Sequence, residues 1–89
     1  TQFMRWKFDP NKSRMVKRQH GISLEEATHI FDQLYIVDQK SDDPEQYRAI
    51  GWFDGKLWSV IYEVRFDRQG EFGWLITAWK ATKQEEEMY

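Results

Sequence analysis

The sequence predicts an α+β fold, in which helices pack on one face of a small, mostly antiparallel sheet in the order β-α-α-β-β-β-α. Three observations predict this fold. Two helix-start signals lie within the first 26 residues, alternating apolar and polar residues fill most of the second half, and a third helix start lies near residue 82. The chain has 89 residues, of which 40% are hydrophobic and 17% aromatic. This length supports one core, so we expect a single domain over residues 1–89.

The first strand and the first helix follow from local signals. Residues 3–8, FMRWKF, interleave apolar and charged side chains, as a half-buried strand does. Asp9 can cap a helix, and Pro10 suits the first helical position because no intrahelical N–H is needed there. We expect this helix to end at His20, since Gly21 suits the left-handed conformation that follows many helices.

Two further helices are expected from capping boxes, one formed by Ser23 with Glu26 and one by Thr82 with Glu85. Apolar residues after Ser23 recur at spacings of three or four, which predicts a single buried stripe along the second helix. The stripe consists of Leu24, Ala27, Phe31 and Leu34, and the terminal helix covers residues 83–89. His29 lies off the stripe, and we expect it to be exposed and structural.

Strands joined by tight turns are expected after residue 45. Residues 36–46 are polar and contain Pro44, which predicts a loop with, at most, a short strand at Tyr35–Val37. Asp54-Gly55 is a strong signal for a two-residue hairpin turn. The expected strands cover residues 46–53, 57–66 and 71–79, with a turn at 67–70.

The composition excludes several kinds of site. The chain has no cysteine, which excludes disulfides, thiolate metal ligands and thiol catalysis. His20 and His29 stand nine residues apart without metal-ligand spacing, and the sequence has no glycine-rich phosphate loop or nucleophile elbow. Asp42, Asp43 and Glu45 cluster in a polar segment and are interpreted as solvated charges. We therefore expect neither a metal nor a cofactor.

The net charge of −2 conceals an uneven distribution. Residues 1–20 carry six basic residues and one acidic residue, whereas residues 21–48 carry seven acidic residues and two basic ones. A basic segment attracts phosphate and an acidic one attracts basic partners, although a solvated helix face is the simpler interpretation. No apolar run approaches the roughly 20 residues that cross a bilayer, and the N-terminus has no apolar signal segment. We expect a cytoplasmic protein without membrane contact.

One chemistry is compatible with the side chains present, namely cleavage of RNA without a metal ion. It requires a base for the 2′-hydroxyl, an acid for the leaving oxygen, and cations near the phosphate. The candidates are Lys12, His20, Arg48, Lys80 and Tyr89. Each of four candidates also has a purely structural interpretation. Lys12 could be a solvated side chain and His20 could cap the end of a helix. Arg48 could pair with Glu63 across strands, and Lys80 could simply end a strand.

Four segments in order resemble one known family. They are FDPNK at 8–12, QHGISLEEATHIFDQ at 19–33, EQYRAIG at 45–51 and ITAWKATKQEEEMY at 76–89. Over residues 6–89 the chain resembles the BrnT family of type II toxins, whose H-G-[IV]-S-x-E-E-A and [ST]-A-x-[KR]-A-T-x-x-E motifs are specific when found together. The resemblance implies a RelE-like fold and a metal-independent ribonuclease that inhibits translation.

The resemblance also implies partners and site residues. It implies a cognate antitoxin, of the ribbon-helix-helix, BrnA-like kind, which masks the toxin and through which the chain contacts operon DNA only indirectly. The assembly would be a homodimer or a hetero-tetramer, and RNA would be the substrate. For catalysis it implies His20 or Tyr89 in proton transfer and Arg48 and Lys80 as phosphate cations. The RNA-binding candidates are Lys12, Arg18 and Trp79.

Several positions depart from the family pattern. Trp79 stands where the family usually has arginine, and Trp74 where it often has another. Gln19, Val16 and Gln46 replace a lysine, an asparagine and an arginine. Tryptophan cannot supply the bidentate phosphate grip of arginine, so the resemblance implies a ribonuclease that is possibly attenuated.

Two alternatives to an active ribonuclease stay open. The chain could be an inactive homologue that binds the antitoxin and acts as a co-repressor, or an RNA-binding module that uses exposed tryptophans as stacking platforms. Trp79 itself has three interpretations: core packing under the last helix, contact with a base or partner, or drift after loss of function.

Overall fold

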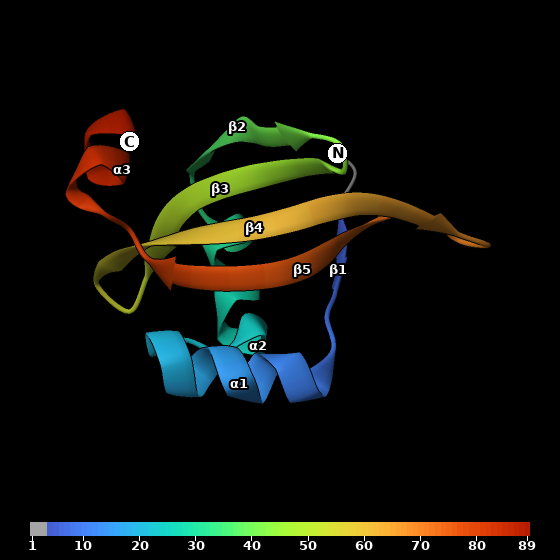
Figure 1. Cartoon of the computed structure of the whole chain (residues 1–89), viewed down its shortest axis with the longest axis horizontal. Helices are drawn as coiled ribbons and strands as arrows, with labels where there is room; N and C mark the ends of the chain where they lie inside the picture. Colours follow the sequence, from blue (N-terminus) through green and yellow to red (C-terminus); the bar gives the residue numbers. More distant parts are fainter. Residues whose placement is uncertain (1–3) are drawn as a thin grey trace.

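The computed structural model describes residues 4–89 and contains a five-stranded sheet with three α-helices (Figure 1). The strands are β1 (Arg5–Lys7), β2 (Tyr35–Asp42), β3 (Glu45–Phe53), β4 (Lys56–Asp67) and β5 (Gly70–Lys80), in the order β1-β5-β4-β3-β2. The helices are α1 (Pro10–His20), α2 (Leu24–Ala27) and α3 (Lys83–Met88), with a 3₁₀ helix η1 (Thr28–Asp32) after α2. Only β1 pairs in parallel, which confirms the α+β class. The first predicted strand began at Phe3, outside the described residues.

α1 begins and ends where the sequence predicts. The Asp9 side chain accepts a hydrogen bond from the Asn11 N–H at 2.9 Å, and Pro10 is the first helical residue. Gly21 follows in the left-handed conformation with φ 86°, and its N–H donates to the Lys17 carbonyl at 2.9 Å. Glycine adopts this conformation without strain, so the chain turns sharply from α1 into α2.

The second helix differs from the prediction. It is a four-residue α-helix that continues as the 3₁₀ helix η1, and it ends before Leu34, which is 80% exposed rather than buried. A 3₁₀ helix has three residues per turn, so Ile30 lies in line with Ala27, and both are fully buried. The predicted Ser23 capping box is present, and His29 is exposed as predicted.

The segment predicted as a loop is the strand β2, so the sheet has five strands rather than four. β2 pairs with β3 from Tyr35 to Asp42, and Pro44 lies in the turn between them. The error has a physical reason. β2 is an edge strand whose side chains are only partly covered, and charged residues are favoured on such strands because they discourage further pairing.

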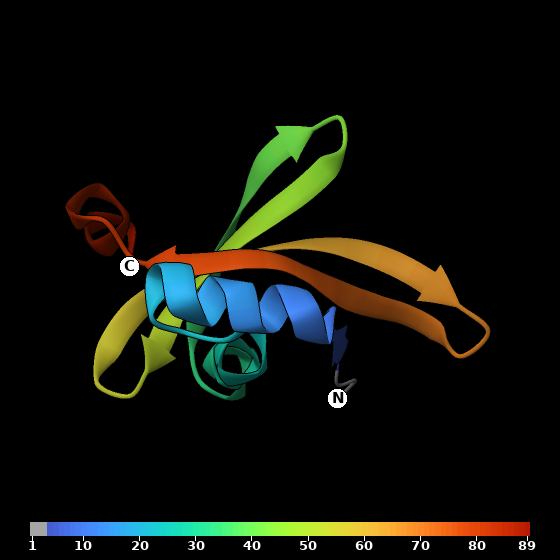
Figure 2. The ribbon, with the colours of Figure 1, turned by 60° about the horizontal axis from the view of Figure 1, so that its bottom comes forward.

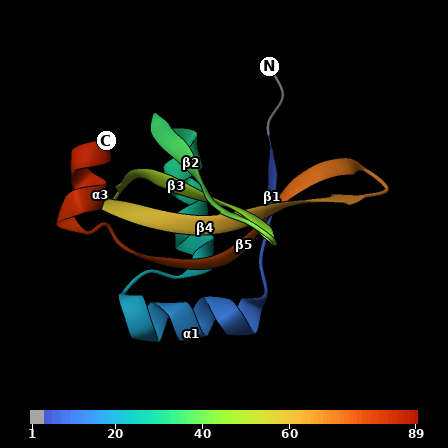
Figure 3. The same ribbon diagram turned by 45° about the horizontal axis from the view of Figure 1, so that its top comes forward.

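The sheet separates α1 and α2 on one face from α3 on the other. Figures 1 and 3 show α1 below the sheet and α3 beside the end of β5 on the upper side. The main core lies between the sheet and the first two helices, and its fully buried members include Val16, Ile22, Leu24, Ile30 and Val60. A smaller cluster of Ile50, Leu57 and Ala81 lies on the α3 side. α3 is thus held by a small apolar cluster and by polar contacts.

A bulge in β5 decides which tryptophans share a face of the sheet. The pairing between β4 and β5 shifts after Ile61, which leaves Ile76 as an extra residue. Residues five apart on a regular strand point to opposite faces, but a bulge shifts the alternation by one. Trp74 and Trp79 therefore lie on the same side of β5, opposite Glu63 and Ser59 of β4. Trp74, at the edge of the sheet, also lines a pocket with Lys12 of α1.

The two long hairpins diverge at one end of the sheet (Figure 2). β3 and β4 pair only as far as Tyr47 and Tyr62, so beyond this point each strand keeps a single neighbour. The Gln46 amide donates to a Glu63 carboxylate oxygen at 3.0 Å just past the last pair. This bond joins the two hairpins where they separate.

β1 is fixed to the β4–β5 hairpin by a close contact with Gly73 and by ion pairs of Arg5 and Lys7 with Asp67. A Cβ added to Gly73 would lie 2.2 Å from the ring of Trp6, so only glycine fits beneath that ring. Trp6 also stacks on Phe31, with ring centroids 3.7 Å apart. The Arg5 guanidinium donates to both carboxylate oxygens of Asp67, at 3.1 and 2.8 Å. These contacts hold the turn end of the β4–β5 hairpin to the first strand.

Candidate functional site

Glu85 connects α3 to the sheet. Its side chain is only 7% exposed, and its Oε1 accepts hydrogen bonds from the Thr82 N–H at 2.9 Å and from the Trp79 Nε1–H at 3.0 Å. Its Oε2 accepts from Arg48 Nη1 at 3.2 Å. The capping box that begins α3, as predicted, therefore also binds β3 and β5.

The acidity of Glu85 reflects these contacts. Burial alone raises the pKa of the Glu85 carboxyl, but the hydrogen bonds from the Thr82 amide and the Trp79 indole outweigh it, and the pKa lies below its usual range. Glu85 is therefore ionised at neutral pH and places a negative charge beside Arg48.

Arg48 lies between two carboxylates. Its Nε and Nη2 donate to the two oxygens of Asp38 at 2.9 and 2.5 Å, in addition to the contact with Glu85, and its side chain is 16% exposed. The hydrogen bonds with Asp38 raise the pKa of Arg48 further above its usual value, so the guanidinium stays charged. The suggested pair with Glu63 is wrong, because Glu63 binds Gln46 and Arg65 instead.

Trp79, the most conspicuous departure from the family pattern, supports the last helix. It is half-buried on the α3 side of the sheet, opposite Ser59 in β4, and its indole N–H donates to Glu85. The hydroxyl oxygen of Ser59 is buried without a hydrogen-bond partner among the described residues. The position that the family usually gives to arginine thus holds an anchor for α3.

Tyr89 is directed toward the start of β2. Its hydroxyl donates to the Leu34 carbonyl oxygen at 2.9 Å, and its ring contacts Trp52 edge-on at a centroid distance of 6.1 Å. The ring remains 39% exposed. A proton-transfer role would require this hydroxyl to exchange its bond with Leu34.

His20 and Lys80 lie on the other side of the sheet. His20 is the exposed last residue of α1, and the adjoining Gly21 lies against the ring of Trp58. Lys80 is the exposed last residue of β5 and is paired with Trp58. The four catalytic candidates therefore form two groups: His20 with Lys80 on the helix side, and Arg48 with Tyr89 on the α3 side. No hydrogen bond between residues 4 and 89 joins the two groups.

The two basic RNA-binding candidates lie on α1. Arg18 is exposed and lines an open pocket, together with Lys17 and Glu26, which form an ion pair at 2.8 Å. Lys12 is half-buried and lines a different pocket, next to Trp74. α1 therefore presents two cationic positions, neither of which lies beside Arg48.

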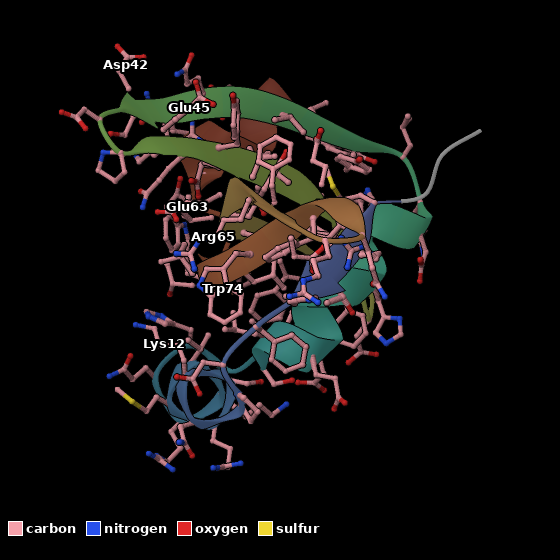
Figure 4. All side chains as sticks on the ribbon, turned by 90° about the vertical axis from the view of Figure 1, so that its right-hand side faces the viewer. Lys12, Asp42, Glu45, Glu63, Arg65 and Trp74 are labelled. Carbon is pink, nitrogen blue, oxygen red and sulfur yellow. The ribbon has the colours of Figure 1, made fainter. Side chains whose placement is uncertain are left out.

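Sequence reasoning missed Arg65 and Asp38 as partners in this region and gave Glu63 the wrong partner. The guanidinium carbon of Arg65 lies 4.9 Å from the centroid of the Trp74 ring, and Arg65 donates to Glu63 at 2.8 Å. Figure 4 shows Trp74 between Arg65 and Lys12. Predicting these contacts requires the register of β4 against β5, including the bulge, and the register of β2 against β3.

Residues 4–89 contain neither a candidate metal site nor a candidate membrane-spanning helix. No group of three or more histidine, cysteine or acidic side chains in this part of the chain is arranged to hold a metal ion. In the same range, no helix is both long enough and apolar enough to cross a membrane.

Comparison with protein families gives a match. The family model described as "Ribonuclease toxin, BrnT, of type II toxin-antitoxin system" matches residues 8–85. No curated protein matches the chain. The family match includes α1, the sheet strands β2 to β5 and the Thr82 to Glu85 capping box.

Proposed function

This chain belongs to the BrnT family of ribonuclease toxins of type II toxin-antitoxin systems, and from that premise we propose that it is a metal-independent endoribonuclease that inhibits translation in the cytoplasm. The match over residues 8–85 is the observation that carries the proposal. The five-stranded sheet, with two helices on one face, supports a RelE-like fold. Such an enzyme would need only side chains that this protein contains, namely histidine, tyrosine, lysine and arginine.

The proposed roles follow the two groups of side chains. Each group holds one proton-transfer candidate and one cation that can stabilise the charge developing on the phosphate: His20 with Lys80 on the helix side, and Tyr89 with Arg48 on the α3 side. Lys12, Arg18 and Trp79 hold the RNA. Of these candidates, Arg48 is the least available to phosphate, because Asp38 and Glu85 already compensate its charge.

Expression in bacteria without an antitoxin tests this function. We expect growth arrest and cleaved RNA, and we expect His20→Ala or Lys80→Ala to relieve both. Normal growth with intact RNA, from a protein shown to be folded by circular dichroism, would overturn the proposal. Cleavage in excess chelator supports the metal-independent mechanism, whereas cleavage restored only by added Mg²⁺ contradicts it.

We further propose that this toxin is attenuated. Trp79 and Trp74 occupy arginine positions, and loss of one group aimed at developing charge typically costs about 10²–10³ in rate. Trp79→Arg, alone and with Trp74→Arg, should increase cleavage of RNA. The exposed Phe66, at the turn end of β4, offers a control, because Phe66→Arg adds the same charge away from the proposed catalytic residues. Unchanged cleavage by folded variants would contradict attenuation.

The second candidate function is an inactive homologue that binds its antitoxin and acts as a co-repressor. The position of Arg48, between Asp38 and Glu85 and 16% exposed, favours it because the cation is not free for phosphate. The partner would be a ribbon-helix-helix, BrnA-like protein that contacts the DNA, in a hetero-tetramer. Co-purification with the neighbouring gene's product and mass measurement of the complex test this. A homodimer of the free chain is the alternative outcome.

A further inference from the structure

Trp74 occupies an unusual position at the edge of the sheet, where a cation lies on each side of it. It comes just before the bulge in β5 and is the last residue of β5 that pairs with β1. Figure 4 shows its ring between Arg65, from β4, and Lys12, from the first turn of α1. Three segments distant in the sequence therefore meet at one aromatic ring.

Arg65 covers one side of Trp74. Its guanidinium carbon lies 4.9 Å from the ring centroid, within the range of a cation–π contact. Two hydrogen bonds to Glu63, at 3.1 and 2.8 Å, orient the guanidinium, and the Gln46 amide orients Glu63 in turn. A guanidinium from the neighbouring strand is thus present beside the position where the family often has an arginine. Glu63 compensates its charge, but the Arg65 side chain is 45% exposed, against 16% for Arg48, and is therefore accessible to phosphate.

The side of Trp74 toward α1 is open. A pocket there is lined by Asp9, Lys12, Trp74, Leu75 and Ile76. β1 stops opposite Trp74, so no strand in residues 4–89 pairs with the outer edge of β5 beyond that point. The pocket therefore combines an aromatic surface, one lysine, the Asp9 carboxylate that caps α1, and strand-edge backbone.

We propose that Trp74 is a stacking platform for one unpaired base of single-stranded RNA, with Lys12 and Arg65 binding the phosphates on either side of that base. Stacking on an aromatic ring needs no particular base, and cations flanking the ring suit a backbone that carries one phosphate per nucleotide. The inference rests on the proposed function for its choice of RNA. It adds a binding residue, Trp74, and a second cation, Arg65, to the residues named above.

Equilibrium binding tests the proposal without requiring cleavage. The probe is a short fluorescein-labelled single strand in which every ribose carries a 2′-O-methyl group, because this group removes the attacking hydroxyl. Measured by anisotropy, Trp74→Ala should weaken binding by about 5- to 100-fold, the range expected for loss of one base stack. Trp74→Phe keeps an aromatic face and should retain most of the affinity.

Charge variants test the phosphate contacts. Lys12→Gln should weaken binding and lower the slope of log affinity against log salt by about one. Lys56→Gln and Trp52→Ala are matched controls, because both residues are exposed and lie at the β3–β4 turn, away from Trp74. They should leave the affinity and the salt slope unchanged. The same strand annealed to its complement has no unpaired base, so its binding should not depend on Trp74.

Several outcomes would overturn the proposal. Equal affinity of wild type and Trp74→Ala overturns it, provided that thermal unfolding shows both to be folded, and so does an equal loss in Trp52→Ala. An effect of Trp74→Ala on antitoxin binding alone assigns the surface to a protein partner instead. Failure of the proposed function can be told apart from failure of this inference. If binding depends on Trp74 but unmodified RNA is not cleaved, the ribonuclease proposal fails and the stacking platform stands. If RNA is cleaved but binding does not depend on Trp74, the stacking platform fails and the ribonuclease proposal stands.

Discussion

Glu85 uses one carboxylate for two tasks, capping α3 and binding the sheet. Its Oε1 accepts from the Thr82 N–H, as a capping box requires, while Trp79 and Arg48 donate to it from β5 and β3. The first task could be predicted, because Thr82 and Glu85 stand three residues apart in the sequence. The second could not, because it depends on which sheet face Trp79 occupies.

Glu85→Gln isolates the charge of this contact. Glutamine can still cap α3 and accept from Trp79, so only the charge-assisted part of the Arg48 contact is lost, and we expect the free energy of unfolding to fall by about 1 kcal/mol at neutral pH. Because the pKa of Glu85 is lowered in the folded protein, the stabilisation that its charge contributes should decrease as the pH falls. Its stabilisation is present above the unfolded pKa of about 4.3 and is lost as the pH falls through the folded value.

Urea denaturation of wild type and Glu85→Gln checks this expectation. The difference between the two proteins should be largest near neutral pH and should shrink as the pH falls below the unfolded pKa of about 4.3. A difference that is constant with pH would show that Glu85 acts by shape alone. Glu86→Gln, a neighbouring exposed acid on α3, is the control and should show no comparable difference.

At the scale of elements, α1 supports the beginning of α2. Ser13 is buried in α1, and its hydroxyl oxygen accepts hydrogen bonds from the Leu24 N–H at 2.9 Å and from the Glu25 N–H at 3.3 Å. Ser23 satisfies a third amide of the same turn. Two side chains, one local and one from the preceding helix, therefore fix a helix of only four residues.

Ser13→Ala should lower the free energy of unfolding by about 1–2 kcal/mol, since two amides lose their partner at a buried site. Chemical denaturation monitored by circular dichroism measures the change. Ser41→Ala, on the edge strand β2, removes a hydroxyl that binds nothing among the described residues and should have little effect. Equal changes in both variants would contradict the role assigned to Ser13.

Gly73→Ala tests the contact between β1 and β5. A methyl group at this position would lie 2.2 Å from the Trp6 ring, and overpacking of this kind typically costs about 1–3 kcal/mol. We expect a lower melting temperature, measured by differential scanning calorimetry. Trp6→Leu removes the obstructing ring. The Trp6→Leu, Gly73→Ala double variant should therefore lose less stability than the sum of the losses in the two single variants. Strict additivity would show that the two residues do not interact.

Helix starts and tight turns could be predicted because their signals are local. Asp9, Ser23 and Thr82 bind amides two or three residues away, and Asp54-Gly55 has the positive φ angles of a two-residue turn. β2 and η1 could not be predicted, because their form depends on distant neighbours. β2 is a strand only because β3 lies beside it, and Ile30 is buried against Gly51 of the sheet.

At the scale of the whole molecule, the sheet separates the candidate site into two halves. His20 and Lys80 lie with the helices, whereas Arg48, Trp79 and Tyr89 lie with α3. The sequence named these residues but could not show which of them share a face. Strand register determines the face, and the bulge at Ile76 reverses the alternation between Trp74 and Trp79.

Arg5 and Phe72 are partners in the sheet, although most of the chain lies between them. A growing chain on the ribosome cannot complete this pair until β5 has left the exit tunnel, and closing so long a loop is a late and slow step. Ribosome-stalled chains that end at Gly70 should therefore be digested by protease. Stalled chains that run through residue 89 and continue into a flexible linker, which occupies the exit tunnel, should resist digestion. Resistance of the shorter chains would contradict this order. The sheet is therefore completed only after β5 has left the tunnel.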